Sequence, residues 1–295
     1  MGNHYVPQYY LKGFQTSATP GCIWAVRDGR EPFLVSVSNI AQENRLYSPD
    51  LEQQLANEVE GPANEVTLRI QNQQPLTPEQ KLVLSRYLEL IWRRVPAQRE
   101  WAKRKYPEIS QPIYERIELA LLEKLESASP AMKPNYQRSL SKLDELRRSD
   151  EEGDEHANEI WLQTLSLDVT PRSAEALSKM RWCFMVAPRN SYYITSDNPF
   201  YFFQSMGIGR VGSEVSFPVT QGVALWATWR NGLDGDYHQA PSQFVKEVNR
   251  RTARACTSLL LSPRSEDWIV DLANKPRESI RVHMLGDNGR IIGRL

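Results

Sequence analysis

The chain has 295 residues with 36 basic and 36 acidic side chains, so its formal net charge is zero, and 40% of its residues are hydrophobic. This mix is typical of a folded globular protein and excludes both a low-complexity disordered chain and a small disulfide scaffold. Zero net charge argues against a general polyanion binder, but it is compatible with a local basic patch.

The apolar pattern and the cysteines indicate the compartment. No run approaches the roughly 18 apolar residues of a membrane helix, and Met1–Pro7 lacks the basic and apolar segments of a secretion signal. The cysteines Cys22, Cys183 and Cys256 are odd in number and far apart, which favours buried thiols in a reducing environment. We expect a cytoplasmic protein that makes no contact with membranes.

Short mixed elements are expected before residue 50. Residues 7–14 predict a turn or two of helix. Residues 22–27 and 33–37 are strand-like, and the turn residues Asp28 and Gly29 between them predict a hairpin.

From about residue 50 to 180 the apolar residues recur at helical spacing. Thr77 should cap a helix whose first position is Pro78, and Pro96 should kink or end that helix. Further helices are expected at 111–127, 136–148 and 157–167, with an acidic surface loop at 151–155.

After residue 180 the pattern changes to short aromatic and β-branched runs. Strands are expected at 182–187, 191–195, 201–204, 214–219, 223–229 and 258–261, with a helix at 243–255 and a hairpin within 280–292. The whole predicts an α+β fold forming a single domain over residues 1–295. In it, the helical segment at about 50–180 packs against one antiparallel or mixed sheet, and the part at about 181–295 is strand-rich.

The glycine run from Gly207 to Gly212 matches the dinucleotide-binding fingerprint letter for letter. That fingerprint requires a helix directly after it, so that the helix N-terminus can face a pyrophosphate. A strand-like segment containing Pro218 follows instead, which favours a glycine loop between strands. The four histidines show no metal-ligand spacing, so zinc chemistry is disfavoured.

Two carboxylates of the strand-rich part suggest phosphodiester chemistry. Asp197 ends one predicted strand and Glu214 begins a later one, an arrangement that resembles metal-dependent nucleases of the restriction-enzyme type. Paired carboxylates there would hold Mg²⁺ or Mn²⁺; no other cofactor is evident. Ser216 stands where such nucleases have a lysine. Alternatively, Asp197 bonds its own backbone in a turn before Pro199.

Basic residues cluster around Pro96 and could bind nucleic acid or a nucleotide, with aromatic rings as stacking surfaces. The members are Arg93, Arg94, Arg99, Lys103, Arg104 and Lys105, interleaved with Trp92, Trp101 and Tyr106. A second group on a later helix comprises Arg250, Arg251 and Arg254. The alternative is a solvated helix face, with Glu89 and Arg93 as an i,i+4 pair and the tryptophans turned inward.

His4 opens a segment rich in apolar and aromatic residues, which indicates docking of the chain start onto the core; the alternative is a disordered terminus. Docking would hold His4 and Gln8 among fixed polar partners. Because histidine titrates near neutral pH, His4 could act as a general acid or base.

These residues carry a family resemblance. The segment from His4 to Phe14, His-Tyr-Val-Pro-Gln-Tyr-Tyr-Leu-Lys-Gly-Phe, closely resembles the opening of the domain of unknown function 4238 family. Further resembling segments are Asn39–Ala41, Leu46–Ser48, Leu55-Ala56 with Glu60, Arg94–Arg99, Thr195–Pro199 and Phe217-Pro218. The resemblance implies no activity. By matching position it singles out the polar residues His4, Gln8, Glu60, Arg94, Arg99, Asp197 and Asn198.

Two functional hypotheses follow. The first is a metal-dependent phosphodiester hydrolase, nuclease-like, in a toxin or phage-defence setting. Its catalytic residues would be His4, Glu60 and Asp197, its substrate-binding residues Gln8, Arg94, Arg99 and Asn198, and its metal ligands Asp197 and Glu214. The second is a non-catalytic binding or adaptor module, in which His4 and Gln8 pin the chain start, Glu60 and Arg94 form a buried ion pair, and Asp197 caps a turn.

Overall fold

The computed structural model describes residues 2–27, 30–152, 155–167, 170–203, 206–231 and 236–275. Contacts divide the chain into two compact units, one formed by Met1–Val95 with Leu167–Leu295 and the other by Pro96–Ser166. The first unit is thus built from two separate stretches of chain. The single domain expected over residues 1–295 stays a prediction.

The larger sheet of the first unit has five strands in the order β10-β5-β9-β8-β7. The strands are β5 (Arg181–Val186), β7 (Tyr201–Phe202), β8 (Glu214–Thr220), β9 (Val223–Thr228) and β10 (Tyr237–Gln239). All neighbours are antiparallel except β10 and β5. Every residue of β9 and all but the last of β8 are buried, because both strands lie inside the sheet and are covered.

A second sheet is antiparallel and has the strand order β3-β2-β11-β6. Its strands are β2 (Cys22–Arg27), β3 (Phe33–Ser36), β6 (Thr195–Ser196) and β11 (Leu259–Ser262), and a separate pair joins β1 (Gly2–His4) to β4 (Gln42–Asn44). The α+β class is confirmed, but the strands of the described residues form three sheets where one was expected. The β2–β3 hairpin does not extend the five-stranded sheet, because the interior strands of that sheet are already paired on both sides. The hairpin pairs with β11 and so belongs to a different sheet.

The helices of the first unit begin and end where local chemistry requires. They are α1 (Gln8–Leu11), α2 (Pro49–Leu55), α3 (Gly61–Gln71), α4 (Pro78–Arg94), α8 (Arg172–Lys179), α9 (Ser242–Ala255) and α10 (Asp267–Ala273), with a π-helical turn at Ala56–Glu60 and 3₁₀ turns at Lys12–Phe14 and Val37–Asn39. Thr77 caps α4 as predicted, and the structure adds a reciprocal capping box between Thr77 and Gln80. The helix ends at Arg94 because Val95 is extended before Pro96.

One buried tyrosine connects the chain start to the strand-rich part. The hydroxyl of Tyr10 donates to the carbonyl of Pro218 at 2.9 Å and lies 2.6 Å from Oγ1 of Thr195. Its ring stacks on Phe217, with ring centroids 5.1 Å apart. Burial of the ring contributes on the order of 2 kcal/mol, and the hydrogen bonds satisfy its polar end.

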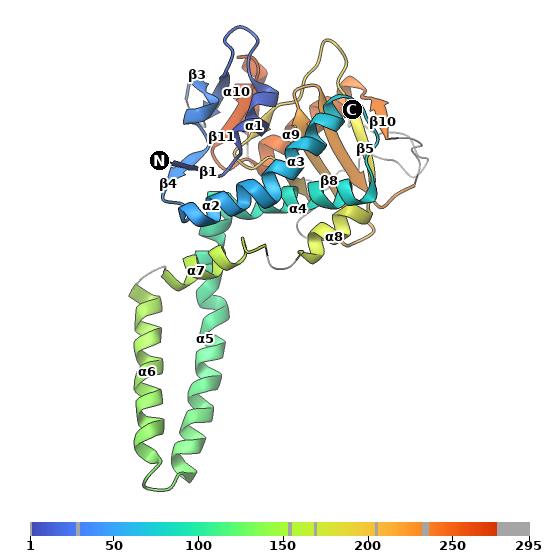
Figure 1. The fold of residues 1–295 in the computed structure, drawn as a ribbon. Coiled ribbons are helices and arrows are strands. Elements are labelled where there is room, and N and C mark those ends of the chain that lie inside the picture. Colours follow the sequence, from blue (N-terminus) through green and yellow to red (C-terminus); the bar gives the residue numbers. More distant parts are fainter. Residues whose placement is uncertain are drawn as a thin grey trace. The chain divides into compact units, whose positions relative to one another are not determined.

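The second unit is helical, and in Figure 1 α5 and α6 lie side by side. It comprises α5 (Pro96–Ser127), α6 (Lys133–Glu152) and α7 (Glu155–Gln163). Two expectations are corrected. The helix expected at 111–127 begins at Pro96 instead, because α5 continues through Pro107 and Pro112, which are exposed, so that water can hydrate the carbonyls to which proline donates no hydrogen bond. Helix α6 continues to Glu152, so the acidic stretch begins as helix rather than loop.

Smaller differences concern the strand ends. The strand expected at 191–195 is reduced to β6, because only Thr195 and Ser196 pair with β11. The glycine run lies between β7 and β8 with Gly207 at φ +76°, and no helix follows it, which confirms the loop. The hairpin within 280–292 lies outside the described residues.

Among the described helices, none is both long enough and apolar enough to cross a bilayer.

Candidate functional site

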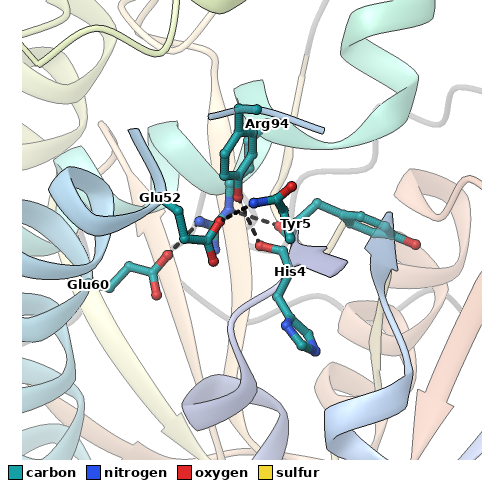
Figure 2. Close-up of polar contacts among 7 residues, drawn as sticks. His4, Tyr5, Glu52, Glu60 and Arg94 are labelled. Atoms are coloured by element: carbon teal, nitrogen blue, oxygen red, sulfur yellow. Dashed lines mark hydrogen bonds and ion pairs between the residues drawn. The ribbon is translucent and has the colours of Figure 1, made fainter. Parts of the chain in front are cut away.

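Arg94, at the C-terminal end of α4, is the centre of a polar cluster against the chain start (Figure 2). Its Nη1 forms an ion pair with Oε1 of Glu60 at 2.5 Å, and its Nε donates to the carbonyl of Tyr5 at 2.9 Å. The side chain of Arg94 is 1% exposed and that of Glu60 20%. The predicted ion pair is therefore present, and the same arginine fixes the backbone next to His4.

The charge of Arg94 is stabilised by its surroundings. Burial alone would lower the pKa of its guanidinium, but the nearby Glu60 carboxylate and Tyr47 outweigh that effect, and the pKa is raised. Removing Glu60 would leave a buried uncompensated cation, which is costly. Two further hydrogen bonds attach strand β1 to residues in and just before α2. Asn3 donates to Oε2 of Glu52 at 2.9 Å, and the hydroxyl of Tyr47 donates to the carbonyl of His4 at 3.1 Å.

His4 is half-buried beside this cluster, on β1. Its Nε2 lies 3.2 Å from the carbonyl of Ser38, so we assign the ring proton to that nitrogen. Burial lowers the pKa of His4, while the Ser38 carbonyl and the Glu52 carboxylate oppose the shift. The imidazole is therefore neutral at neutral pH.

Asp197 and Asn198 form a second, separate set of contacts, in which they hold the connection from α9 to β11. Oδ1 of Asp197 accepts from the backbone N–H of Thr257 at 2.7 Å. Its Oδ2 accepts from the N–H and hydroxyl of Ser258 at 2.7 and 3.0 Å and from the N–H of Leu259 at 3.1 Å. Nδ2 of Asn198 donates to the carbonyl of Ala255 at 2.9 Å. Both residues are almost fully buried.

This arrangement corrects the expectation of a turn on Asp197's own backbone. The partners lie some sixty residues later in the chain. They are the backbone N–H groups of Thr257, Ser258 and Leu259, which follow the end of α9, and the hydroxyl of Ser258, and an acceptor side chain can satisfy such donors. Burial raises the pKa of Asp197, and the donors of Thr257 and Ser258 oppose that shift. A carboxylate with four donors already in place stabilises the fold and gives little support to a catalytic role.

Glu214 lies in a third cluster, at the start of β8. Nη2 of Arg251 donates to its Oε2 at 2.8 Å, and both side chains are 1% exposed. The guanidinium of Arg251 also lies 5.4 Å from the ring centroids of Tyr201 and Phe203 and has Glu247 at 3.7 Å.

The metal ligands proposed from the sequence can be compared with this geometry. Asp197 accepts four hydrogen bonds and Glu214 is neutralised by an arginine, so neither carboxylate offers the uncommitted charge that Mg²⁺ or Mn²⁺ prefers. Within the described part of the chain, no group of three or more His, Cys, Asp or Glu side chains could hold a metal ion. The arrangement gives no support to the metal pair.

The last two sequence candidates are Gln8 on α1 and Arg99 on α5. Gln8 is exposed as the first residue of α1. Arg99 belongs to the helical unit, where its guanidinium lies 5.9 Å from the ring centroid of Trp161. The alternative reading of the basic cluster is supported at α4, since Arg93 pairs with Glu89 and Trp92 packs edge-on against Phe202.

Sequence reasoning missed a pocket of about 400 Å³ in the first unit, beside α9 and α10. We call it the α9 pocket. Its charged and aromatic lining comprises Tyr192, Lys246, Arg250, Arg264, Glu266, Trp268, Asp271 and Lys275. Four of these side chains are basic and two acidic. One feature of the sequence could have indicated this pocket. Lys246, Arg250 and Arg254 recur every four residues, so they lie on one face of α9. We call these three residues the basic stripe.

Comparisons with known proteins give a family and nothing further. The model of one family, described as a protein of unknown function (DUF4238), matches residues 3–266. No curated protein and no solved structure matches the chain. The match extends over every motif that singled out the candidate residues.

Proposed function

The chain belongs to the DUF4238 family, and we propose that it is a non-catalytic binding module that takes its ligand in the α9 pocket. In this proposal the family motifs maintain the fold, and recognition depends on residues outside them. The observation that carries it is the state of the motif groups. Arg94 is paired and buried, and Asp197 accepts four hydrogen bonds, so both are already committed to protein partners.

The pocket supports the second half of the proposal. Its volume of about 400 Å³ is within the range of small-molecule sites, and it combines apolar walls with convergent polar groups. Its wall is also fixed in place, because the side chain of Asn249 accepts from the N–H of Ile194 and donates to the carbonyl of Tyr192, both at 3.0 Å. A preformed wall lowers the entropic cost of binding.

Denaturation of variants tests this proposal. For Arg94→Gln and Asp197→Asn we expect the free energy of unfolding to fall by about 3 kcal/mol or more, because each change leaves buried charged or polar groups without partners. Matched controls come from the exposed pair of Lys105 and Glu108, 2.7 Å apart on α5. Lys105→Gln and Glu108→Gln should cost no more than about 1 kcal/mol.

A phosphodiester hydrolase of the nuclease type is the second candidate, and one observation favours it. Nη2 of Arg94 is buried without a hydrogen-bond partner among the described residues, and a phosphate oxygen could accept from it. This candidate predicts cleavage of transfer RNA, single-stranded DNA or duplex DNA in Mg²⁺ or Mn²⁺, with loss in EDTA. It also predicts that Arg94→Gln and Asp197→Asn abolish cleavage with little change in melting temperature, which would refute the binding module.

A further inference from the structure

We infer that the α9 pocket binds a nucleotide, with its phosphates on the basic stripe and its base against the aromatic pair Tyr192 and Trp268. This inference rests on the proposed function and names its ligand class. It is carried by an excess of positive charge along α9, and by partly exposed aromatic rings in the same pocket.

The charges along α9 do not balance. Lys246, Arg250, Arg251 and Arg254 are countered by two buried carboxylates, Glu214 and Glu247. Glu214 forms an ion pair with Arg251 at 2.8 Å. Glu247 lies 3.5 Å from Arg250 and 3.7 Å from Arg251 and forms an ion pair with each. Counted over these six described side chains, the positive charges exceed the negative ones by two.

Arg254 shows that excess most directly. Its Nη1 is buried and has no hydrogen-bond partner among the described residues. Burial lowers the pKa of Arg254, and the neighbouring Arg250 and Arg251 lower it further, against the attraction of Glu247 and Tyr201. A guanidinium presents several donors that match phosphate oxygens. An anion beside Arg254 and Arg250 would supply the missing acceptor.

The spacing of the stripe suits more than one phosphate. Side chains at i and i+4 lie about 5–6 Å apart on a helix, so Lys246, Arg250 and Arg254 form a row of cations. Like charges at this spacing oppose each other and weaken the helix. A row of phosphates would remove that repulsion. Lys246 and Arg250 line the pocket, and Arg254 follows one turn beyond Arg250.

The other wall of the pocket suits a base. The rings of Tyr192 and Trp268 have centroids 5.7 Å apart and planes inclined by 50°, so neither ring covers the face of the other. The guanidinium of Arg264 lies over the Tyr192 ring, 5.0 Å from its centroid, and its side chain is 62% exposed, so a base can stack on the guanidinium plane. Bases stack on aromatic rings and on arginine planes. The carboxylate of Glu266 is occupied by the indole N–H of Trp268, which fixes the ring.

Calorimetric titration of the full chain with ATP, adenosine and inorganic triphosphate tests the inference. We expect ATP to bind at least about tenfold more tightly than either fragment, because it alone uses both walls. Arg250→Gln and Arg254→Gln should each weaken ATP binding about tenfold. The matched control is Lys179→Gln, an exposed lysine at the end of α8. It should leave the affinity unchanged.

Trp268→Leu separates the two walls. Because Trp268 also packs against buried apolar residues, its variant needs an internal check of folding. We expect Trp268→Leu to lose about tenfold in ATP affinity while keeping its affinity for inorganic triphosphate. A short single-stranded RNA with a 5′-triphosphate, compared with the same RNA carrying a 5′-hydroxyl, distinguishes an RNA end from a free nucleotide as the source of the same chemistry.

Three results would overturn the inference: ATP that binds no more tightly than inorganic triphosphate, no binding of either, or ATP affinity that the two arginine variants leave unchanged. None of these would alter the denaturation results for Arg94 and Asp197, so the binding module would stand. Release of phosphate from bound ATP, abolished by Arg250→Gln, would instead refute the non-catalytic function and keep the nucleotide site.

Discussion

Arg94 and Arg254 are both arginines near a helix end in the same unit, yet their surroundings differ. Arg94 is 1% exposed, has a carboxylate at 2.5 Å and serves the backbone of the chain start. Arg254 is half-buried, and its Nη1 has no acceptor in the described part of the chain. The comparison teaches that a residue of a family motif, such as Arg94, can have all its role inside the fold. A residue outside the motifs, such as Arg254, can be the one that is available to a ligand.

Adjacent residues of α9 sharpen that comparison with the largest expected effect. Arg251→Met removes the partner of the buried Glu214 and should lower the free energy of unfolding by about 3–5 kcal/mol. Arg250→Gln removes a 41% exposed arginine and should cost no more than about 1 kcal/mol. Denaturant titration of the two variants measures the difference. Equal effects would remove the distinction between committed and uncommitted arginines.

A double-mutant cycle on Glu60 and Arg94 isolates the ion pair itself. The single variants Glu60→Gln and Arg94→Gln should not be additive, and we expect a coupling energy of about 1–3 kcal/mol. The same cycle on Lys105 and Glu108, which are exposed, should give less than about 1 kcal/mol. A coupling near zero at Glu60 and Arg94 would show that the buried pair does not hold the chain start.

The half-buried His4 makes stability depend on pH. Its pKa is lowered in the folded state, mainly by burial, so the unfolded chain binds more protons as the pH falls below about 6.5. The stability contributed by the neutral ring is thus complete above that pH and is lost on acidification. Denaturation of the natural chain and of His4→Gln at about pH 7.5 and about pH 5.5 should show a smaller acid loss for the variant. Equal losses would contradict this assignment.

The smallest expected effect has the opposite sign. Arg254→Gln removes a like-charge neighbour of Arg250 and should raise the free energy of unfolding by about 0.2–0.5 kcal/mol at low salt. Because salt screens exposed charges, the gain should shrink at high ionic strength. Urea titrations at two salt concentrations measure it. A loss of stability would mean that Arg254 is committed to the fold, as Arg94 is.

Much of the fold could be predicted because the signals were local. Thr77 and Pro78 identified the start of α4, and Pro96 identified its end. Residues 22–27 are strand β2 as expected, since a short apolar run followed by turn residues is typical of the first strand of a hairpin. The number of sheets could not be predicted, because it depends on which distant strand β2 joins, and the pairing of β2 with β11 leaves no trace in either segment.

The contacts of the candidate residues could likewise be predicted only in part. The ion pair of Glu60 and Arg94 was part of one of the two hypotheses, and the family resemblance had singled out both residues. The partners of Asp197 were not predictable, since its acceptors serve backbone N–H groups, which every residue type carries. The α9 pocket was missed because its walls come from segments near residues 192, 246 and 268 that only the folded chain brings together.

The hydrogen bonds of Tyr10 have a consequence for the order of events during synthesis. The hydroxyl joins a residue made early to Pro218, which is 208 positions further along the chain. At about 5–20 residues per second, this partner emerges roughly 10–40 seconds after Tyr10 itself. The hydroxyl of Tyr10, which is buried in the folded protein, has no Pro218 carbonyl to donate to during that time. The first unit therefore closes late, and interruption of translation before residue 218 would leave its N-terminal segment without its core.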